Sequence, residues 1–160
     1  MTLTAVLDTT LLSNFAHLQR SDLIYAALGK DLATTPMAMA ELRTGEAGGS
    51  VPTCDWTWLA VLELSQAEQT LAAEFSRQLD PGETECLAVA VTRQCKFLSD
   101  DFAARRLAKQ RGLQVSGTIG ILLVLIDQRY LTLQAADDLL RTLILAGYHS
   151  PVKSLGELLP

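Results

Sequence analysis

The chain has 160 residues, of which 49% are hydrophobic, and its formal net charge is −5 at pH 7. This length and composition are typical of one globular domain with a sizeable core, and they exclude a disordered or collagen-like chain. No apolar run reaches membrane-spanning length, because the longest, 119–126, has eight residues and contains a glycine.

The cysteines and the N-terminus indicate a reducing compartment. Cys54, Cys86 and Cys95 are odd in number and lack C-x-x-C spacing, which argues against a disulfide framework and against zinc. No basic segment precedes the first apolar stretch, so no signal peptide is expected. We therefore predict a cytoplasmic protein without a membrane partner.

The first half of the chain alternates short apolar segments with amphipathic ones. Residues 3–7 form an apolar run that ends at Asp8, which predicts a buried strand, and a helix is predicted over 9–18. A second helix is predicted from Ser21 as N-cap to Gly29 as terminator. Next we predict a brief strand at 32–34 and a helix that begins at Thr35-Pro36 and ends at Gly45. A glycine-rich turn at 45–52 and a further strand at 58–64 follow.

The second half continues the alternation. Ser65 and Glu68 form a capping box that opens a helix towards Leu79, and Asp80-Pro81-Gly82 breaks the chain. Further strands are predicted at 97–99 and 113–115. Further helices are predicted at 83–94, 101–111, 118–128 and 134–146, and Ser150-Pro151 is expected to open a last one. Because strands alternate with helices, we predict a three-layer α/β/α domain with a parallel sheet of about four or five strands.

Carboxylates recur after predicted strands and inside predicted helices. They are Asp8, Glu41, Glu85, Asp100 and Asp101. Ligands of open parallel sheets bind beyond the carboxyl ends of strands, where the strand order reverses, so these acids can meet if the first and fourth strands are neighbours. Convergent carboxylates without His or Cys favour Mg²⁺ or Mn²⁺ over zinc. This pattern predicts phosphoryl chemistry.

Each acid also has an ordinary structural explanation. Glu41 could be an exposed helical residue, Glu83 and Glu85 could compensate the dipole of their helix, and Asp101 could be an N-cap. Only the joint pattern indicates a site.

The charges are distributed unevenly. Residues 1–80 contain 4 Lys or Arg against 10 Asp or Glu, whereas residues 81–160 contain 9 against 8. Arg105 and Lys109 lie one turn apart on the helix that follows Asp101, and this face is expected to contact the phosphates of an anionic substrate. The alternative is a solvated helix face with ordinary charges.

Several segments, in order, resemble PIN domains. VLDTTLLSNF resembles the first strand and helix of that family, and TPMAMAELRTG resembles its second motif. LDPGETECLAVAV resembles the third motif in a branch that keeps Glu there, and FLSDDFAARRLAKQRGLQVSGTIGILL resembles the fourth motif with its following elements. The closing GYHSPVKSLGELL is similar to the C-terminal helix of that branch. The resemblance covers nearly the whole chain, so residues 1–160 are expected to form a single PIN-like domain.

The resemblance implies a catalytic, metal-binding quartet of Asp8, Glu41, Glu85 and Asp101. Asp101 is preferred over Asp100 because the family often has Asn or Arg at the earlier place, although Asp100 is kept as an additional metal candidate. Glu85 is preferred over Glu83 because it aligns with the acid before the small-residue face of the helix. Thr9 and Ser99 are expected to orient carboxylates or bound water, and Arg105 and Lys109 are expected to bind substrate.

The implied function is metal-dependent endoribonuclease activity on RNA, with Mg²⁺ or Mn²⁺ as cofactor. The resemblance further implies the toxin of a toxin–antitoxin pair, with a small antitoxin as partner. A homodimer is expected because relatives commonly dimerise and because helices 21–28 and 118–128 are strongly apolar. The alternative is a PIN-like module that binds nucleic acid or protein with little or no catalysis.

Other catalytic classes lack their required residues. A haloacid-dehalogenase-type phosphatase needs a second Asp where this chain has Thr10, and a receiver domain needs an acidic pair where Asp8 stands alone. His17 and His149 have no serine or cysteine nucleophile motif beside them and are predicted to be structural.

Overall fold

The computed structural model describes residues 2–160 and contains a fully parallel, five-stranded sheet in the order β3-β2-β1-β4-β5. The strands are β1 (Ala5–Leu7), β2 (Leu32–Thr34), β3 (Ala60–Val61), β4 (Lys96–Leu98) and β5 (Val115–Ser116). The predicted α/β fold with about four or five parallel strands is therefore confirmed.

Helices connect the strands in the predicted order. They are α1 (Thr9–His17), α2 (Asp22–Leu28), α3 (Pro36–Ala47), α4 (Gln66–Phe75), α5 (Pro81–Arg93), α6 (Phe102–Gln110), α7 (Thr118–Asp127), α8 (Leu133–Leu145) and the 3-10 helix η1 (Leu155–Leu158). Several boundaries differ from the prediction: β3 is shorter than the strand predicted at 58–64, β5 begins where the strand predicted at 113–115 ends, and the last helix has Ser154 as its N-cap instead of opening at Ser150-Pro151. Helix α3 continues through Gly45, because one helical glycine costs only about 1 kcal/mol, and α5 begins two residues earlier, at Pro81.

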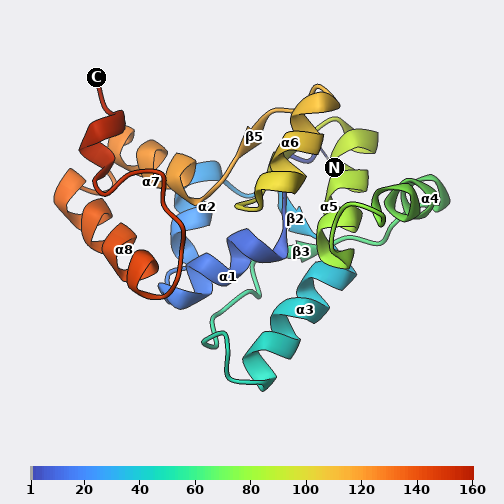
Figure 1. Ribbon diagram of the computed structural model, residues 1–160, viewed down its shortest axis with the longest axis horizontal. Coiled ribbons are helices and arrows are strands. Elements are labelled where there is room, and N and C mark those ends of the chain that lie inside the picture. The colour runs from blue at the N-terminus through green and yellow to red at the C-terminus, as the bar shows by residue number, and fades with distance from the viewer. Residues whose placement is uncertain (1) are drawn as a thin grey trace.

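The central strands place alternate residues on opposite faces of the sheet. Leu7 and Leu98 belong to a core cluster with α1, α2, α7 and α8, whereas Val6 and Phe97 belong to a cluster with α4, α5 and α6. Figure 1 shows α7 and α8 on one side, α4 and α5 on the other, and strands between them. The molecule therefore has three layers, and both faces of the sheet are covered as parallel sheets require.

The chain reverses its direction across the sheet between β1 and β4. Strands β1, β2 and β3 follow one another towards one edge, and β4 and β5 lie on the other side of β1. Leu7 and Leu98 are register partners, so Asp8 follows β1 beside the segment that follows β4. This is the switch point at which open α/β sheets bind ligands.

Helices α2 and α7 pack against each other in the same chain. Leu23 and Ile24 of α2 are buried, as are Ile121 and Leu125 of α7. The apolar surface that led us to expect dimerisation through these two helices is thus largely covered within one chain, and that part of the reasoning was wrong. No helix within residues 2–160 is both long and apolar enough to cross a membrane.

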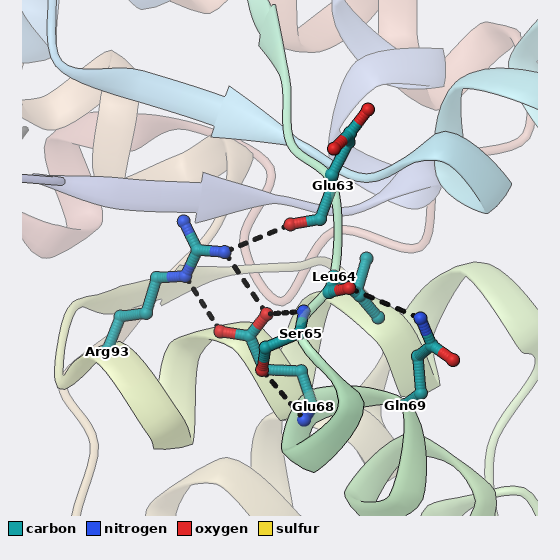
Figure 2. Close-up of polar contacts among 6 residues, drawn as sticks. All are labelled: Glu63, Leu64, Ser65, Glu68, Gln69 and Arg93. Atoms are coloured by element: carbon teal, nitrogen blue, oxygen red, sulfur yellow. Dashed lines mark hydrogen bonds and ion pairs between the residues drawn. The ribbon is translucent and has the colours of Figure 1, made fainter.

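A partly buried ion pair ties α4 to α5 and to the segment after β3 (Figure 2). Arg93 donates to both carboxylate oxygens of Glu68, at 2.7 and 3.1 Å, and to the carbonyl oxygen of Glu63 at 3.1 Å. The Glu68 side chain is only 2% exposed, and it also accepts the Ser65 amide in the predicted capping box. The Arg93 guanidinium holds the pKa of Glu68 below its usual range.

Replacing Arg93 with Met is expected to destabilise the protein by about 2–3 kcal/mol at pH 7, because it leaves a buried carboxylate unpaired. We place the loss below the usual range for buried pairs because the Arg93 side chain is 34% exposed. The pair contributes fully above the unfolded pKa of Glu68, and its contribution is lost as pH falls through the lower folded value.

Urea unfolding at pH 7 and near pH 3 measures this effect. The difference between Arg93→Met and the parent should shrink at the lower pH. Arg141→Met is the matched control, because Arg141 and Asp138 form an exposed pair on one helix, expected to contribute less than about 1 kcal/mol. Equal losses in the two variants would contradict the prediction.

Candidate active site

Asp8 is fully buried at the carboxyl end of β1, where it caps α1. Its Oδ1 accepts hydrogen bonds from the Thr10 hydroxyl at 2.6 Å and the Leu11 amide at 3.2 Å. Its Oδ2 is buried and accepts none from the described part of the chain. Burial raises the pKa of Asp8 to about 7, against the nearby hydroxyls of Ser99 and Thr10 and the Leu11 amide, which lower it.

Glu41 links three helices at the same edge of the sheet. From α3 its Oε2 accepts the Thr9 hydroxyl at 2.7 Å, and its Oε1 accepts the Gly82 amide at 2.8 Å. Thr9 follows Asp8 in the chain, and Gly82 precedes Glu83. Glu41 is therefore held between the first turns of α1 and α5, and the Thr9 hydroxyl is one of the two groups that hold it.

Glu83 is buried at the start of α5, where the charges of Asp8 and Asp101 act on it. Glu83 is 5% exposed, and its Oε2 accepts the Asp80 amide at 3.1 Å. Burial, and to a smaller extent the charges of Asp101 and Asp8, raise the pKa of Glu83 to about 7 against the hydrogen bond from the Asp80 amide, which lowers it. Repulsion of this kind marks carboxylates that share one site.

Glu85 is directed to a different place. Its Oε2 accepts the amide of Met37 at 2.9 Å, so it caps the N-terminus of α3. Successive helical residues turn by about 100°, so side chains two residues apart leave the helix in nearly opposite directions. The structure thus gives the Glu85 carboxylate a partner on α3, whereas the resemblance led us to expect a metal contact. The Asp80-Pro81-x-Glu83 spacing, typical of a helix start, was the signal that Glu83 occupies the first turn.

Ser99 and Asp101 follow the last residue of β4, Leu98, whose register partner Leu7 precedes Asp8. Asp101 caps α6 through a 2.8 Å hydrogen bond from the Ala104 amide to its Oδ2. Ser99 is fully buried, and its Oγ accepts the Asp101 amide at 3.0 Å. Ser99 therefore orients the backbone that carries Asp101, as well as lying near Asp8.

Asp100, in the segment after β4, forms hydrogen bonds to residues of α1 and α7. Its Oδ1 accepts the Thr118 amide at 2.9 Å, and its Oδ2 accepts the Asn14 amide group at 2.7 Å and the Thr118 hydroxyl. Its own amide donates to the Thr10 hydroxyl at 2.9 Å, the same hydroxyl that donates to Asp8. Both carboxylate oxygens are thus occupied, which favours a structural contribution over the metal contact predicted for Asp100. Thr10 was missed by the sequence reasoning.

The two predicted substrate-binding residues, Arg105 and Lys109, differ in exposure and in hydrogen bonding. Arg105 is half-buried, and its Nη1 donates to the Ser99 carbonyl oxygen at 2.9 Å. Lys109 is exposed, and with Arg106 it lines a groove of about 1080 Å³ between α6, α7 and the segment 148–151. His17 and His149 line a smaller cavity of about 330 Å³ beside Asn14 and Asp100.

The donor set fits a hard divalent cation, although its oxygens are not gathered at ligand distances. Within residues 2–160, no three Asp, Glu, His or Cys side chains form a ready-made metal group. The buried Oδ2 of Asp8 nevertheless lacks a partner, and two neighbouring carboxylates have pKa values of about 7. A cation would satisfy that oxygen and neutralise the repulsion, at the cost of rotating side chains such as Asp101 out of its cap.

Gly82 permits the close approach of Glu41 to α5. A Cβ at this position would lie 2.7 Å from the Thr9 hydroxyl oxygen and 2.9 Å from the Glu41 carboxyl carbon. Gly82→Ala is therefore expected to displace Glu41 and to destabilise the protein by about 1–3 kcal/mol. Urea unfolding measures the loss. Gly48→Ala is the control, because its nearest neighbour would be the Thr44 carbonyl oxygen at 3.4 Å; an equal loss in the control would contradict the proposed crowding.

Comparison with known proteins places the fold. No curated protein matches the chain significantly. Among solved structures, the "Crystal structure of PAE2754 from Pyrobaculum aerophilum" superposes with a TM-score of 0.55 and 14% sequence identity, covering 78% of this chain and 90% of that chain. At this identity the likeness shows the fold alone. The family described as "DUF3368: PIN domain" matches residues 4–160, nearly the whole chain, and this chain therefore belongs to that family of PIN domains.

Proposed function

We propose that this protein is a metal-dependent endoribonuclease that hydrolyses RNA phosphodiester bonds. PIN domains are generally nucleases and generally use divalent metals. The observation that carries the proposal is Asp8, a fully buried carboxylate with one unpartnered oxygen at the switch point of the sheet. An ionised carboxylate without a partner is costly to bury, so ionised Asp8 lowers the stability of the metal-free protein. A residue that lowers stability in this way is typical of a functional site.

In this proposal Asp8, Glu41, Glu83 and Asp101 hold the cation. All four offer oxygen, the ligand atom preferred by Mg²⁺ and Mn²⁺. When bound, the cation activates water for attack and relieves charge on the phosphate and the leaving oxygen. Glu83 replaces Glu85 because it lies near Asp8 and Asp101, whereas Glu85 caps α3.

The residues around the acids hold them in place. Thr10 donates to Oδ1 of Asp8, while Oδ2 has no hydrogen-bond partner among the described residues and is available to a cation. Thr9 and the Gly82 amide fix both oxygens of Glu41, and Ser99 holds the backbone of Asp101. Contacts of this kind orient metal-binding carboxylates and tune their affinity.

Exposed cations on α6 supply affinity for the phosphates that flank the cleaved bond. Arg106 and Lys109 are exposed and form no ion pair with any residue in the described part of the chain. Arg105 supports this surface by bonding the Ser99 carbonyl, so its replacement would also disturb the end of β4. Phosphate contacts give affinity that is independent of sequence and sensitive to salt.

The test is cleavage of labelled RNA and DNA by the purified protein, with Mg²⁺, with Mn²⁺ and with a chelator. We expect metal-dependent cleavage of RNA inside the strand, abolished by the chelator and absent from an Asp8→Asn preparation made in parallel. Cleavage of DNA alone would redirect the proposal to deoxyribonuclease activity. Binding of RNA with no cleavage under any metal would favour the non-catalytic PIN-like module instead.

We also propose that the protein is the toxin of a toxin–antitoxin pair and acts as a homodimer. The support is its family together with exposed apolar side chains around α8, where Leu145 is 84% and Tyr130 is 54% exposed. Expression of the parent should arrest growth, whereas the Asp8→Asn variant should not. Light scattering at micromolar concentration should give twice the mass of one chain, and a monomer would remove the dimer from the proposal.

A further inference from the structure

Phe102 is a large apolar side chain with no place in the core. It is 78% exposed and belongs to neither core cluster. It is the first residue of α6 and directly follows Asp101, one of the four proposed metal-binding acids. Consecutive Cα atoms are about 3.8 Å apart, so the Phe102 backbone directly adjoins the proposed cation site while its ring is exposed to solvent.

The ring lines the groove that also contains the cations of α6. Arg105, Arg106 and Lys109 line this groove, and Asp100 is the one acid among its described lining residues. Three cations against one carboxylate give the groove a net positive charge in a chain of net charge −5. Tyr148 and Pro151 add further flat or rigid apolar surface along the same groove.

We propose that this groove holds one strand of nucleic acid and that Phe102 stacks on the base beside the cleaved phosphate. A groove that combines cations with exposed aromatic rings is the usual design of single-strand binding, because cations track the backbone while rings stack on bases of any sequence. A base inside a duplex cannot reach such a ring. The inference rests on the proposed function for its substrate, but base stacking can be measured without catalysis.

The charge of the groove favours nucleic acid over a protein partner. An exposed Phe could also anchor an acidic peptide, which the same cations would attract. The position of Phe102 next to Asp101, at the switch point where the proposed reaction occurs, supports a strand that continues from the acids into the groove.

The test measures coupling between the ring and one base. Binding of a short single-stranded RNA is followed by fluorescence anisotropy in the presence of a chelator, so that no cleavage occurs. An abasic site is moved along the RNA one position at a time. For the parent, one position should weaken binding by about 5- to 150-fold, the scale of losing one stacked base.

Phe102→Ala should weaken binding of intact RNA by a similar factor, and the abasic site at that position should then have no further effect. Phe102→Trp should restore both the affinity and the dependence on that base, whereas Phe102→Leu should not. Equal abasic effects in the parent and Phe102→Ala, or parent-like binding by Phe102→Leu, would overturn the proposal. So would unchanged RNA binding by Phe102→Ala together with lost binding of a Glu-rich peptide, because the groove would then accept a protein.

Two further measurements separate this inference from the proposed nuclease activity. Because Phe102 is exposed, the thermal midpoint of Phe102→Ala should match that of the parent. The rise in thermal midpoint caused by Mn²⁺ should also be equal in the parent and Phe102→Ala, because the Phe102 ring offers no ligand to the proposed cation site. If the parent hydrolyses no RNA, the nuclease proposal fails while the binding experiment still decides the stacking.

Discussion

Asp8→Asn is expected to stabilise the metal-free protein at pH 8 while abolishing cleavage. Asp8 is fully buried, and burial raises its pKa from 3.8 to about 7. That difference corresponds to a free energy on the order of 4 kcal/mol, and we expect about half of it to be recovered in the variant, because part of the burial cost is relaxed by side-chain movement.

The sign of the pH dependence follows from proton binding. Between pH 4 and 7 the unfolded chain has lost the Asp8 proton, whereas the folded chain retains it. The unfolded state therefore binds fewer protons, and the stability of the metal-free parent falls as pH rises through this window. Asp8→Asn should flatten this decline, while Asp127→Asn, at an exposed helical position, should leave it unchanged.

Addition of Mn²⁺ should reverse the order of stability. At a hundredfold excess over its dissociation constant, an ion that binds only the folded state adds about 2.7 kcal/mol. The parent should gain this stability and Asp8→Asn should not, as measured by urea unfolding at pH 8 in chelator and in Mn²⁺. A parent that becomes more stable between pH 5 and 8 without metal, or a variant that gains as much from Mn²⁺, would contradict the assignment of Asp8.

The second large effect is a contrast between Glu83→Gln and Glu85→Gln. Glu83→Gln is expected to lower cleavage at least about a hundredfold, the scale of losing one group that stabilises charge in an active site. It should also raise the stability of the metal-free protein at pH 8, because burial and the charges of Asp101 and Asp8 raise the pKa of Glu83 to about 7.

Glu85→Gln should retain most of the activity. Its carboxylate accepts one hydrogen bond, from the Met37 amide, and an amide oxygen can accept the same bond, so a loss of at most about 1–2 kcal/mol in stability is expected. Cleavage rates and Mn²⁺-dependent shifts in the thermal midpoint measure both variants side by side. If Glu85→Gln were the inactive variant, the assignment from the sequence would be restored.

Local patterns in the sequence were sufficient for the architecture. The strand before Asp8 and the strand before Asp100-Asp101 were predicted from apolar runs, and they are β1 and β4. The capping box of Ser65 and Glu68 opens α4 as predicted. These features depend on neighbours a few residues apart, and parallel strands joined by helices leave few topologies.

The direction of individual side chains depended on contacts far apart in the chain. Glu83 and Glu85 both lie near the start of one helix, and only the packing of α5 against β1 and α3 decides which of them faces Asp8. Asp100 and Asp101 are likewise adjacent in sequence, yet Thr118 and Asn14 engage the first while the second caps α6. Arg105 donates a hydrogen bond to the Ser99 carbonyl oxygen, and the distribution of charges along the sequence does not predict this contact.

The sequence by itself therefore determined the order of elements, the parallel sheet and the strand ends that Asp8 and Asp101 follow. The tertiary structure alone decided which hydrogen-bond partners each acid has, and it showed that α2 and α7 cover each other. The physical reason is that helix and strand formation depends on residues within a turn or two, whereas a carboxylate's partners come from segments up to 40 residues away or more, as with Glu41 and Gly82. The distant hydrogen-bond partners of a carboxylate are brought together only when the core packs.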